Sequence, residues 1–317
     1  MFAPPEQPCP PLAYGGAERI IDVWVRKLID RGHKVDLYAG PGSTCPATNT
    51  FLARSPAMAE EVYLAALILE RNPMYDAVID YSANHLAGQH CERVVSIMGG
   101  DPFRKYPHDE VRNRVYVSRA FADFNHAWNH PVIVEALTYD PKGVPLVTPD
   151  KEIMAFIGLV HPMKGIHMAA GACRRTGRRL HVWGPVRDEG YFRALMNIGS
   201  GDYHGVLMQD GRDEAFGASV FFHPTIICDA SPLAPREAML RGTPVIAGPV
   251  GGVLESVSPG ISGCFATTVK EFIDAIPLAL TLDRSQVKRA AERYNDPDAS
   301  TDVLEALCTA AAKGRVW

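Results

Sequence analysis

A lysine at the start of a predicted helix forms a candidate anion site in the second half of the sequence. Phe156-Ile157-Gly158 ends a predicted strand, and Lys164-Gly165 opens the next predicted helix. The amino end of a helix favours negative charge, and a lysine ammonium adds a positive charge there. This arrangement suits a phosphate group, and the alternative is that Lys164 is a solvated surface charge.

A glycine pair before the first predicted helix forms a second candidate anion site. Gly15 and Gly16 stand in the segment Tyr14-Gly15-Gly16-Ala17-Glu18. Glycines let the backbone amides at the amino end of a helix approach an anion closely. On its own, the pair also fits a flexible turn between two elements.

Two acidic residues of the second half, Asp229 and Glu237, are spaced so that they could bind separate hydroxyl groups of one ligand. Asp229 lies in a predicted loop and Glu237 near the start of a predicted helix. Carboxylates suit the recognition of hydroxyl groups because they accept hydrogen bonds from them. The structural alternatives are a helix cap for Asp229 and a favourable charge near a helix amino end for Glu237.

Predicted strands and helices alternate in both halves of the sequence. In the first half, helices are predicted over residues 19–31, ending at Gly32, and 64–69, and strands over residues 35–39, 77–79, 94–98 and 115–117. In the second half, strands are predicted over residues 153–157, 180–183, 220–222 and 244–247, and helices over residues 165–175, 191–196, 235–240 and 269–280. The alternation predicts an α/β protein with two doubly wound, Rossmann-like, parallel-sheet domains that face each other across a cleft.

The polar segment 148–151 interrupts this pattern and predicts the boundary between the two domains. We expect one domain over residues 1–147 together with a C-terminal helix at about 298–317, and a second over residues 148–297. Four apolar residues at helical spacing give that last helix a face with which to return to the first domain. They are Val303, Leu304, Leu307 and Ala311.

The composition argues against several classes of protein. The 32 Lys and Arg against 36 Asp and Glu give a formal net charge of −4, without clustered basic residues, so nucleic-acid binding is not expected. No apolar segment reaches the ~20 residues that span a bilayer, and no signal peptide is visible. The seven scattered cysteines form no C-x-x-C pair, which favours reduced thiols, no metal site and a cytoplasmic location. A dehydrogenase is disfavoured because no G-x-G-x-x-G follows a first strand.

Taken together, the segments resemble the retaining glycosyltransferases of family 4, which have the GT-B fold. In the first half the resemblance is carried by residues 14–19 and 31–35, and in the second half it begins at Phe156-Ile157-Gly158 with Lys164-Gly165. Its most specific part runs from Glu237 through residue 246, followed by the glycine-containing segments 251–255 and 260–263.

The resemblance implies a role for each candidate residue of the second half. Lys164, which follows the strand glycine Gly158, would hold the diphosphate of a nucleotide sugar, which we expect to be a UDP-sugar. Glu237 would bind the ribose hydroxyls, and Asp229 would bind hydroxyls of the transferred sugar. The backbone amides of Ser231 and Leu233 would approach the sugar and the phosphate, and the loop at Gly15 and Gly16 would close over the donor.

These roles describe a hexosyltransferase-type, retaining and metal-independent enzyme. Lys164, Asp229 and Glu237 would be its catalytic residues, and the nucleotide sugar would be a co-substrate, with no further cofactor. Stabilisation of charge on the departing nucleoside diphosphate matters more to such a reaction than a protein base does.

The sequence departs from the family pattern at several positions. Leu159 stands where the family usually has an arginine, Asp229 where it usually has a glutamate, and Pro232 where it often has a glycine. The segment 95–100 lacks the histidine that many members carry. Leu159, Pro232 and the short start of the sequence suggest one alternative to the enzyme, a non-catalytic nucleotide-sugar-binding protein or a partner subunit of degenerate glycosyltransferase origin.

Two further predictions concern the start of the sequence and the acceptor side. Because only residues 1–3 precede Pro4, we expect the opening strand of the first domain to be stunted or absent. The acceptor is expected to be small or lipid-linked, and peripheral contact with a membrane stays open. Candidate acceptor residues, each of which also fits a solvated loop, are Asp101, Arg104, Lys105, Ser118 and Arg119.

Overall fold

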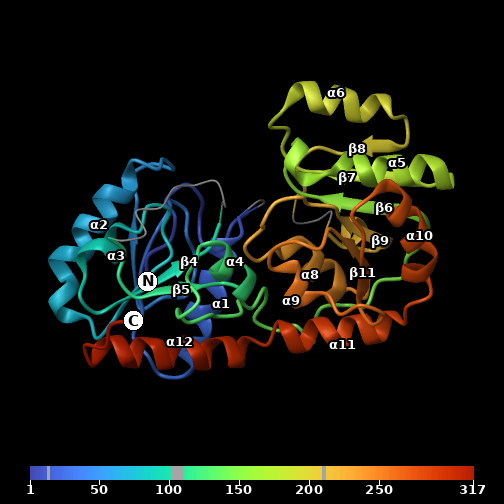
Figure 1. The fold of residues 1–317 in the computed structure, drawn as a ribbon. Coiled ribbons are helices and arrows are strands. Elements are labelled where there is room, and N and C mark those ends of the chain that lie inside the picture. Colours follow the sequence, from blue (N-terminus) through green and yellow to red (C-terminus); the bar gives the residue numbers. More distant parts are fainter. Residues whose placement is uncertain (13–14, 101–109, 209–211) are drawn as a thin grey trace. The chain divides into compact units, whose positions relative to one another are not determined.

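The computed structural model describes residues 1–12, 15–100, 110–208 and 212–317. The chain divides into two compact units (Figure 1). Unit 1 contains Met1–Tyr139 and Asn295–Trp317, and unit 2 contains Asp140–Tyr294. The boundary therefore lies ahead of the polar segment 148–151, because Val147 is already held in unit 2 by a hydrogen bond from its amide to the carbonyl of Arg241 (3.2 Å).

Unit 2 contains one six-stranded sheet in which every paired strand is parallel, with the order β11-β10-β9-β6-β7-β8. Its strands are β6 (Asp150–Ile157), β7 (Arg179–Trp183), β8 (Gly201–Tyr203), β9 (Ala218–His223), β10 (Val245–Ala247) and β11 (Gly263–Phe265). Its helices are η2 (Pro162–Lys164), α5 (Ile166–Thr176), α6 (Glu189–Asn197), α7 (Arg212–Phe216), α8 (Leu233–Leu240), α9 (Val253–Ser256), α10 (Val269–Leu280) and α11 (Arg284–Tyr294).

Helices cover both faces of this sheet, as a doubly wound fold requires (Figure 1). Helices α5 and α10 pack together on one face, where alternate strand residues meet apolar residues of both helices. Helix α8 packs against α11 and contacts β9 and β10. The fully buried core on the α5 side includes Met154, Phe156, Val220, Phe222, Ile246, Cys173 and Phe272.

Unit 1 contains shorter parallel strands, which are joined through one residue. Its strands are β1 (Asp36–Ala39), β2 (Asn49–Leu52), β3 (Val78–Asp80), β4 (Val94–Met98) and β5 (Arg114–Tyr116). Strand β1 pairs with β2, and β3, β4 and β5 form a second group. Phe2 bridges Tyr38 of β1 and Asp80 of β3, and its amide donates to the carbonyl of Ile79 (2.8 Å). The expectation of a stunted opening strand is confirmed, because a single residue takes the place between the two groups.

The helices of unit 1 are α1 (Ala17–Asp30), α2 (Glu60–Arg71), η1 (Asn72–Met74), α3 (Leu86–His90), α4 (Arg119–Phe124) and α12 (Pro297–Ala312). Helix α12 packs on α1, where the indole Nε1 of Trp24 donates to Ser300 Oγ (2.9 Å). Leu304 and Ala311 are fully buried, as their spacing predicts. Val303 was wrongly included in this face, since it is 39% exposed.

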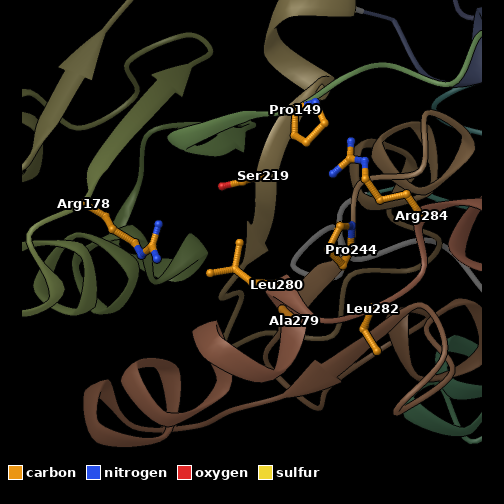
Figure 2. Close-up of a pocket in the computed structure, with 8 residues that line it drawn as sticks. All are labelled: Pro149, Arg178, Ser219, Pro244, Ala279, Leu280, Leu282 and Arg284. Carbon is orange, nitrogen blue, oxygen red and sulfur yellow. The ribbon is translucent and has the colours of Figure 1, made fainter.

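A hollow of about 470 Å³ opens at the amino edge of the unit 2 sheet (Figure 2). Pro149, Arg178 and Pro244 each directly precede a strand, and Ser219 lies near the start of β9. Arg178 and Arg284 reach toward it from opposite sides (Figure 2). In parallel α/β sheets ligands bind at the carboxyl ends of the strands, which is the other edge. The hollow is therefore separate from the candidate site described next.

Candidate functional site

Lys164 lies at the carboxyl edge of the unit 2 sheet, in the loop between β6 and α5. It ends the short helix η2, and Gly165 follows in the left-handed conformation (φ +63°) as the amino cap of α5. A Cβ atom on Gly165 would lie 2.0 Å from the carbonyl oxygen of Pro224. Only glycine fits there, because the turn and the segment after β9 are in direct backbone contact.

Lys164 forms an ion pair with Asp229, in the loop after β9. The Nζ of Lys164 is 2.5 Å from Oδ2 of Asp229, and the two side chains are 19% and 23% exposed. Burial alone would raise the pKa of Asp229, but Lys164 and His223 outweigh burial and hold that pKa below its usual range. Two residues that are 65 positions apart in sequence are thus brought together as a charged pair at the carboxyl edge of the sheet.

His223 is the last residue of β9 and a site residue that the sequence reasoning missed. The residue is 5% exposed, and its Nε2 has no hydrogen-bond partner in the described part of the chain. Burial lowers the pKa of His223 to about 4, with Asp229 opposing that shift and Lys164 adding to it. Thr225, two residues later, is 1% exposed and its Oγ1 likewise lacks a partner among the described residues.

The start of α8 supplies the other predicted donor-binding residues. Pro232 is the amino cap of α8, Leu233 begins the helix, and Glu237 follows one turn later, half-buried. Ser231 Oγ accepts a hydrogen bond from Nη1 of Arg236 (2.9 Å). Arg236 is 1% exposed and stacks over the ring of Tyr294 (5.0 Å), so it fixes the loop that carries Ser231.

Glycines let other loops approach this edge closely. The amide of Gly252 donates to the carbonyl of Asp229 (2.8 Å), and a Cβ atom on Gly251 would lie 2.4 Å from that same oxygen. The carbonyl of Gly158, just after β6, would lie 1.8 Å from a Cβ atom on Gly184. These glycines therefore allow close backbone contacts around Asp229 and after β6.

In unit 1, Gly15 and Gly16 lead into α1, and Gly16 is its amino cap. A Cβ atom on Gly15 would lie 2.6 Å from Cβ of Pro11. Glu18, in the first turn of α1, is 5% exposed, and burial raises its pKa to about 7. The glycines do precede a helix, as the sequence predicts, and the same turn contains a buried carboxyl group that the sequence reasoning did not single out.

The candidate acceptor residues divide into two groups. Asp101, Arg104 and Lys105 lie outside the described residues. Ser118 is the amino cap of α4, where its Oγ accepts from the amide of Phe121 (3.1 Å). Arg119 donates from Nη1 to the carbonyl of Trp128 (3.0 Å). The solvated-loop alternative does not describe these two residues, because Ser118 is fully buried and Arg119 is the first residue of α4.

Neither a metal-binding cluster nor a membrane-spanning helix is found among the described residues. Among them, no group of three or more His, Cys, Asp or Glu side chains is arranged to hold a metal ion. Within the same residues, no helix combines the length and the apolar character needed to cross a membrane.

Part of unit 2 matches a known protein family. Residues 151–281, most of unit 2, match the family described as "Glycosyl transferases group 1". Most of unit 2 is therefore similar to a group 1 glycosyltransferase domain. Lys164, Asp229, His223 and Glu237 all lie inside the matched part of this domain.

A relative of known activity matches over part of its length. The D-inositol 3-phosphate glycosyltransferase of Mycolicibacterium smegmatis is 28% identical over 162 residues, which are 45% of this chain and 37% of that protein. The match thus spans little more than a third of the relative.

Solved structures match along the whole chain. AviGT4, a glycosyltransferase involved in avilamycin A biosynthesis, is similar with a TM-score of 0.78 and 22% identity, covering 100% of this chain and 98% of that one. Anabaena HepE in complex with UDP and glucose gives a TM-score of 0.73 at 15% identity, covering 96% and 97%. These neighbours are GT-B glycosyltransferases, so the chain has the GT-B fold.

Proposed function

We propose that the protein is a retaining, metal-independent glycosyltransferase of the hexosyltransferase type. It transfers a sugar from a nucleotide diphosphate donor, a UDP-sugar, to a small-molecule or lipid-linked acceptor in the cytoplasm. The observation that carries the proposal is the Lys164–Asp229 pair, which lies at the carboxyl edge of the sheet inside the group 1 domain. The HepE structures that contain UDP and UDP-glucose support the choice of nucleotide.

The ion pair suggests how the free site prepares for a donor. Without a ligand, the carboxylate of Asp229 neutralises the ammonium of Lys164, which limits the cost of holding either charge partly buried. A diphosphate brings its own negative charge, so Lys164 turns to the phosphate and Asp229 becomes available to hydroxyls of the sugar. With a donor bound, Lys164 and Asp229 then have the roles that the family resemblance implies. Before a donor binds, the ion pair holds both side chains in place.

Stabilisation of the leaving phosphate is the central chemical task. As the bond between sugar and phosphate breaks, negative charge builds on the nucleoside diphosphate, and nearby cations and helix amides stabilise it. Because Leu159 replaces the usual arginine, Lys164 and the amino ends of α5 and α8 must meet most of that charge. Glu237 on α8 would hold the ribose hydroxyls.

Substitution of Lys164 tests the proposal. We expect Lys164→Ala to lower donor turnover at least about tenfold, or ~1.4 kcal/mol of transition-state stabilisation, in assays with UDP-glucose, UDP-galactose, GDP-mannose and ADP-glucose. Lys270→Ala is the matched control, because the Lys270 side chain is 83% exposed and far along the sequence on α10. Equal turnover by the Lys164→Ala and Lys270→Ala variants would contradict the assignment.

The roles of Glu237 and Asp229 are distinguished by the affinity of their variants for bare UDP, measured by calorimetry. Glu237→Gln should weaken UDP binding, because it removes charge-assisted hydrogen bonds to the ribose. Asp229→Asn should leave UDP affinity unchanged or increase it, since it frees Lys164, while sugar transfer falls. If Asp229→Asn loses as much UDP affinity as Glu237→Gln does, the division of roles is wrong.

A non-catalytic nucleotide-sugar-binding protein is the alternative that the replaced family residues Leu159 and Pro232 favour. The same assays separate it from the enzyme. Binding of a nucleotide sugar without hydrolysis or transfer, with every acceptor offered, would support the alternative.

A further inference from the structure

We propose that His223 and Thr225 bind a hydroxyl group of the transferred sugar and so determine which nucleotide sugars the site accepts. This inference rests on the proposed function, since it assigns two further residues to the same donor site. Their positions, their missing partners and the charges around them support it.

Both residues belong to the central part of the ligand-binding edge. Strand β9 lies between β6 and β10, so its carboxyl end is flanked by the loop that carries Lys164 and by the turn after β10. The carbonyl of His223 accepts from the amide of Gly248 (2.9 Å). The amide of Ile226 donates to the carbonyl of Met163, next to Lys164 (3.1 Å). Residues 223–226 are therefore tied to both neighbouring loops.

Each residue has a buried side-chain polar atom that needs a partner. His223 Nε2 and Thr225 Oγ1 lack hydrogen-bond partners in the part of the chain that the structure describes. A buried polar group without a partner costs about 1–3 kcal/mol, and most such groups in proteins are paired. Two of them, two residues apart and beside a candidate donor site, point to hydrogen bonds that a polar ligand supplies.

The charge of the histidine indicates which part of the ligand it meets. Burial lowers the pKa of His223 to about 4, so the ring is neutral at pH 7, with one nitrogen donating and the other accepting. A neutral ring adds no positive charge for a diphosphate, which Lys164 already attracts. A neutral imidazole and a threonine hydroxyl can instead exchange hydrogen bonds with an uncharged hydroxyl of the sugar. The carboxylate of Asp229 is a third group that can accept such a bond.

The backbone around these residues leaves little room to rearrange. A Cβ atom on Gly165 would lie 2.0 Å from the carbonyl oxygen of Pro224, and one on Gly248 would lie 2.3 Å from that of Thr225. The chain between His223 and Thr225 is thus held from both sides by backbone contacts. Such a rigid segment discriminates between sugar hydroxyls by position, because a missing partner leaves the protein groups unpaired.

Thr225→Val gives the sharpest test, because its effects on stability and on binding have different signs. Valine has a similar shape and removes the unpartnered hydroxyl, so the free protein should be as stable as the unsubstituted chain or more stable. The affinity for bare UDP should stay within about twofold, whereas the affinity for the preferred UDP-sugar should fall about tenfold. Thr225→Ser, which keeps the hydroxyl, should restore that affinity.

Thr301→Val on α12 is the matched control for a buried threonine. Its hydroxyl donates to the carbonyl of Pro297 (2.7 Å), so this change should lower the melting temperature and leave the preference among sugars unchanged. His223→Gln and His223→Phe complete the set. The glutamine variant retains polar groups, and the phenylalanine variant should reduce the difference in affinity between UDP-glucose, UDP-galactose and UDP-xylose.

The outcomes distinguish this inference from the proposed function. If the unsubstituted chain binds neither UDP-sugars nor GDP-mannose nor ADP-glucose, the proposed function fails, and this inference with it. If it binds and turns over a donor, and the Thr225→Val and His223→Phe variants keep the same ratios of affinity among sugars, only this inference is overturned. A parallel loss of bare UDP affinity in both variants would also overturn it, since it would place them at the phosphate.

Discussion

Asp229, which is partly buried, and Glu18, which is buried, have opposite pKa shifts, and the difference lies in their neighbours. Asp229 is bonded to Lys164, so its charged form is favoured despite burial. Glu18 lies in the first turn of α1, where burial raises its pKa to about 7 and the weaker influence of Arg19 does not compensate. The first acid is therefore ionised at neutral pH, while the second is close to half-protonated.

Glu18 should make the stability of unit 1 depend on pH. Between pH 4.5, the ordinary pKa, and about 7, folded Glu18 keeps a proton that the unfolded chain has lost. Its contribution to the free energy of unfolding is thus fully present below pH 4.5 and declines as pH rises toward 7, by about 3 kcal/mol in all. Glu18→Gln should remove this dependence and stabilise the protein at pH 8, as measured by urea unfolding.

A carboxyl group in solvent serves as the control for Glu18. Glu70→Gln, at an exposed position of α2, should change neither the stability nor its dependence on pH. An identical pH profile for the Glu18→Gln variant and the unsubstituted protein would contradict the burial argument.

At the scale of elements, one arginine side chain links several parts of unit 2. Arg284, the first residue of α11, donates to the carbonyls of Ala218 (3.3 Å) and Val147 (3.3 Å) and to Thr243 Oγ1 (2.8 Å). These acceptors belong to the start of β9, to the segment before β6 and to the segment before β10. Burial lowers the pKa of Arg284 to about 10, which still leaves the side chain charged at neutral pH.

Arg284→Met should destabilise unit 2 by about 2 kcal/mol, because several acceptors lose a charged donor. Arg289→Met, at an exposed position of the same helix, controls for the change in charge and helix propensity. The measurement is thermal unfolding of both variants. If the Arg284→Met variant were as stable as the Arg289→Met variant, the desolvation cost of the arginine would equal the gain from its hydrogen bonds.

The elements that the sequence predicts best are the ones with a strong periodic pattern. Helix α1 was expected to end at Gly32, and it ends at Asp30 with Gly32 in the left-handed conformation (φ +86°). Strands β2, β8 and β11 were not predicted, since they are three or four residues long and lie at sheet edges. Their pairing with neighbours, rather than their own composition, holds them in place.

The same limit applies to the candidate site. The residue types at Lys164, Asp229 and Glu237 were readable, but the ion pair between the first two depends on the packing of β6 beside β9. His223 stands in a run of apolar residues, where a single histidine is easily taken for part of the core. Its missing hydrogen-bond partner is a property of the folded chain that no sequence pattern reveals.

At the scale of the whole molecule, the two units are separate compact bodies, and Lys164, Asp229 and Glu237, which we propose to bind the nucleotide sugar, all lie in unit 2. Ligand that binds only the folded form raises stability. We therefore expect differential scanning calorimetry to resolve two transitions, of which saturating UDP raises one by several degrees. Lys164→Ala should reduce that shift, and equal shifts of both transitions would contradict the assignment of UDP to unit 2.

The division of the chain also sets an order for folding during synthesis. Unit 2 is one continuous segment, whereas unit 1 needs α12, which packs on α1, and Trp317, whose indole donates to the carbonyl of Arg114 (3.1 Å). As the chain leaves the ribosome, residues 1–139 emerge first but cannot bury Trp24 until residues 295–317 arrive. Unit 2 can thus complete its core while unit 1, whose first residues are made earlier, still lacks its last helix.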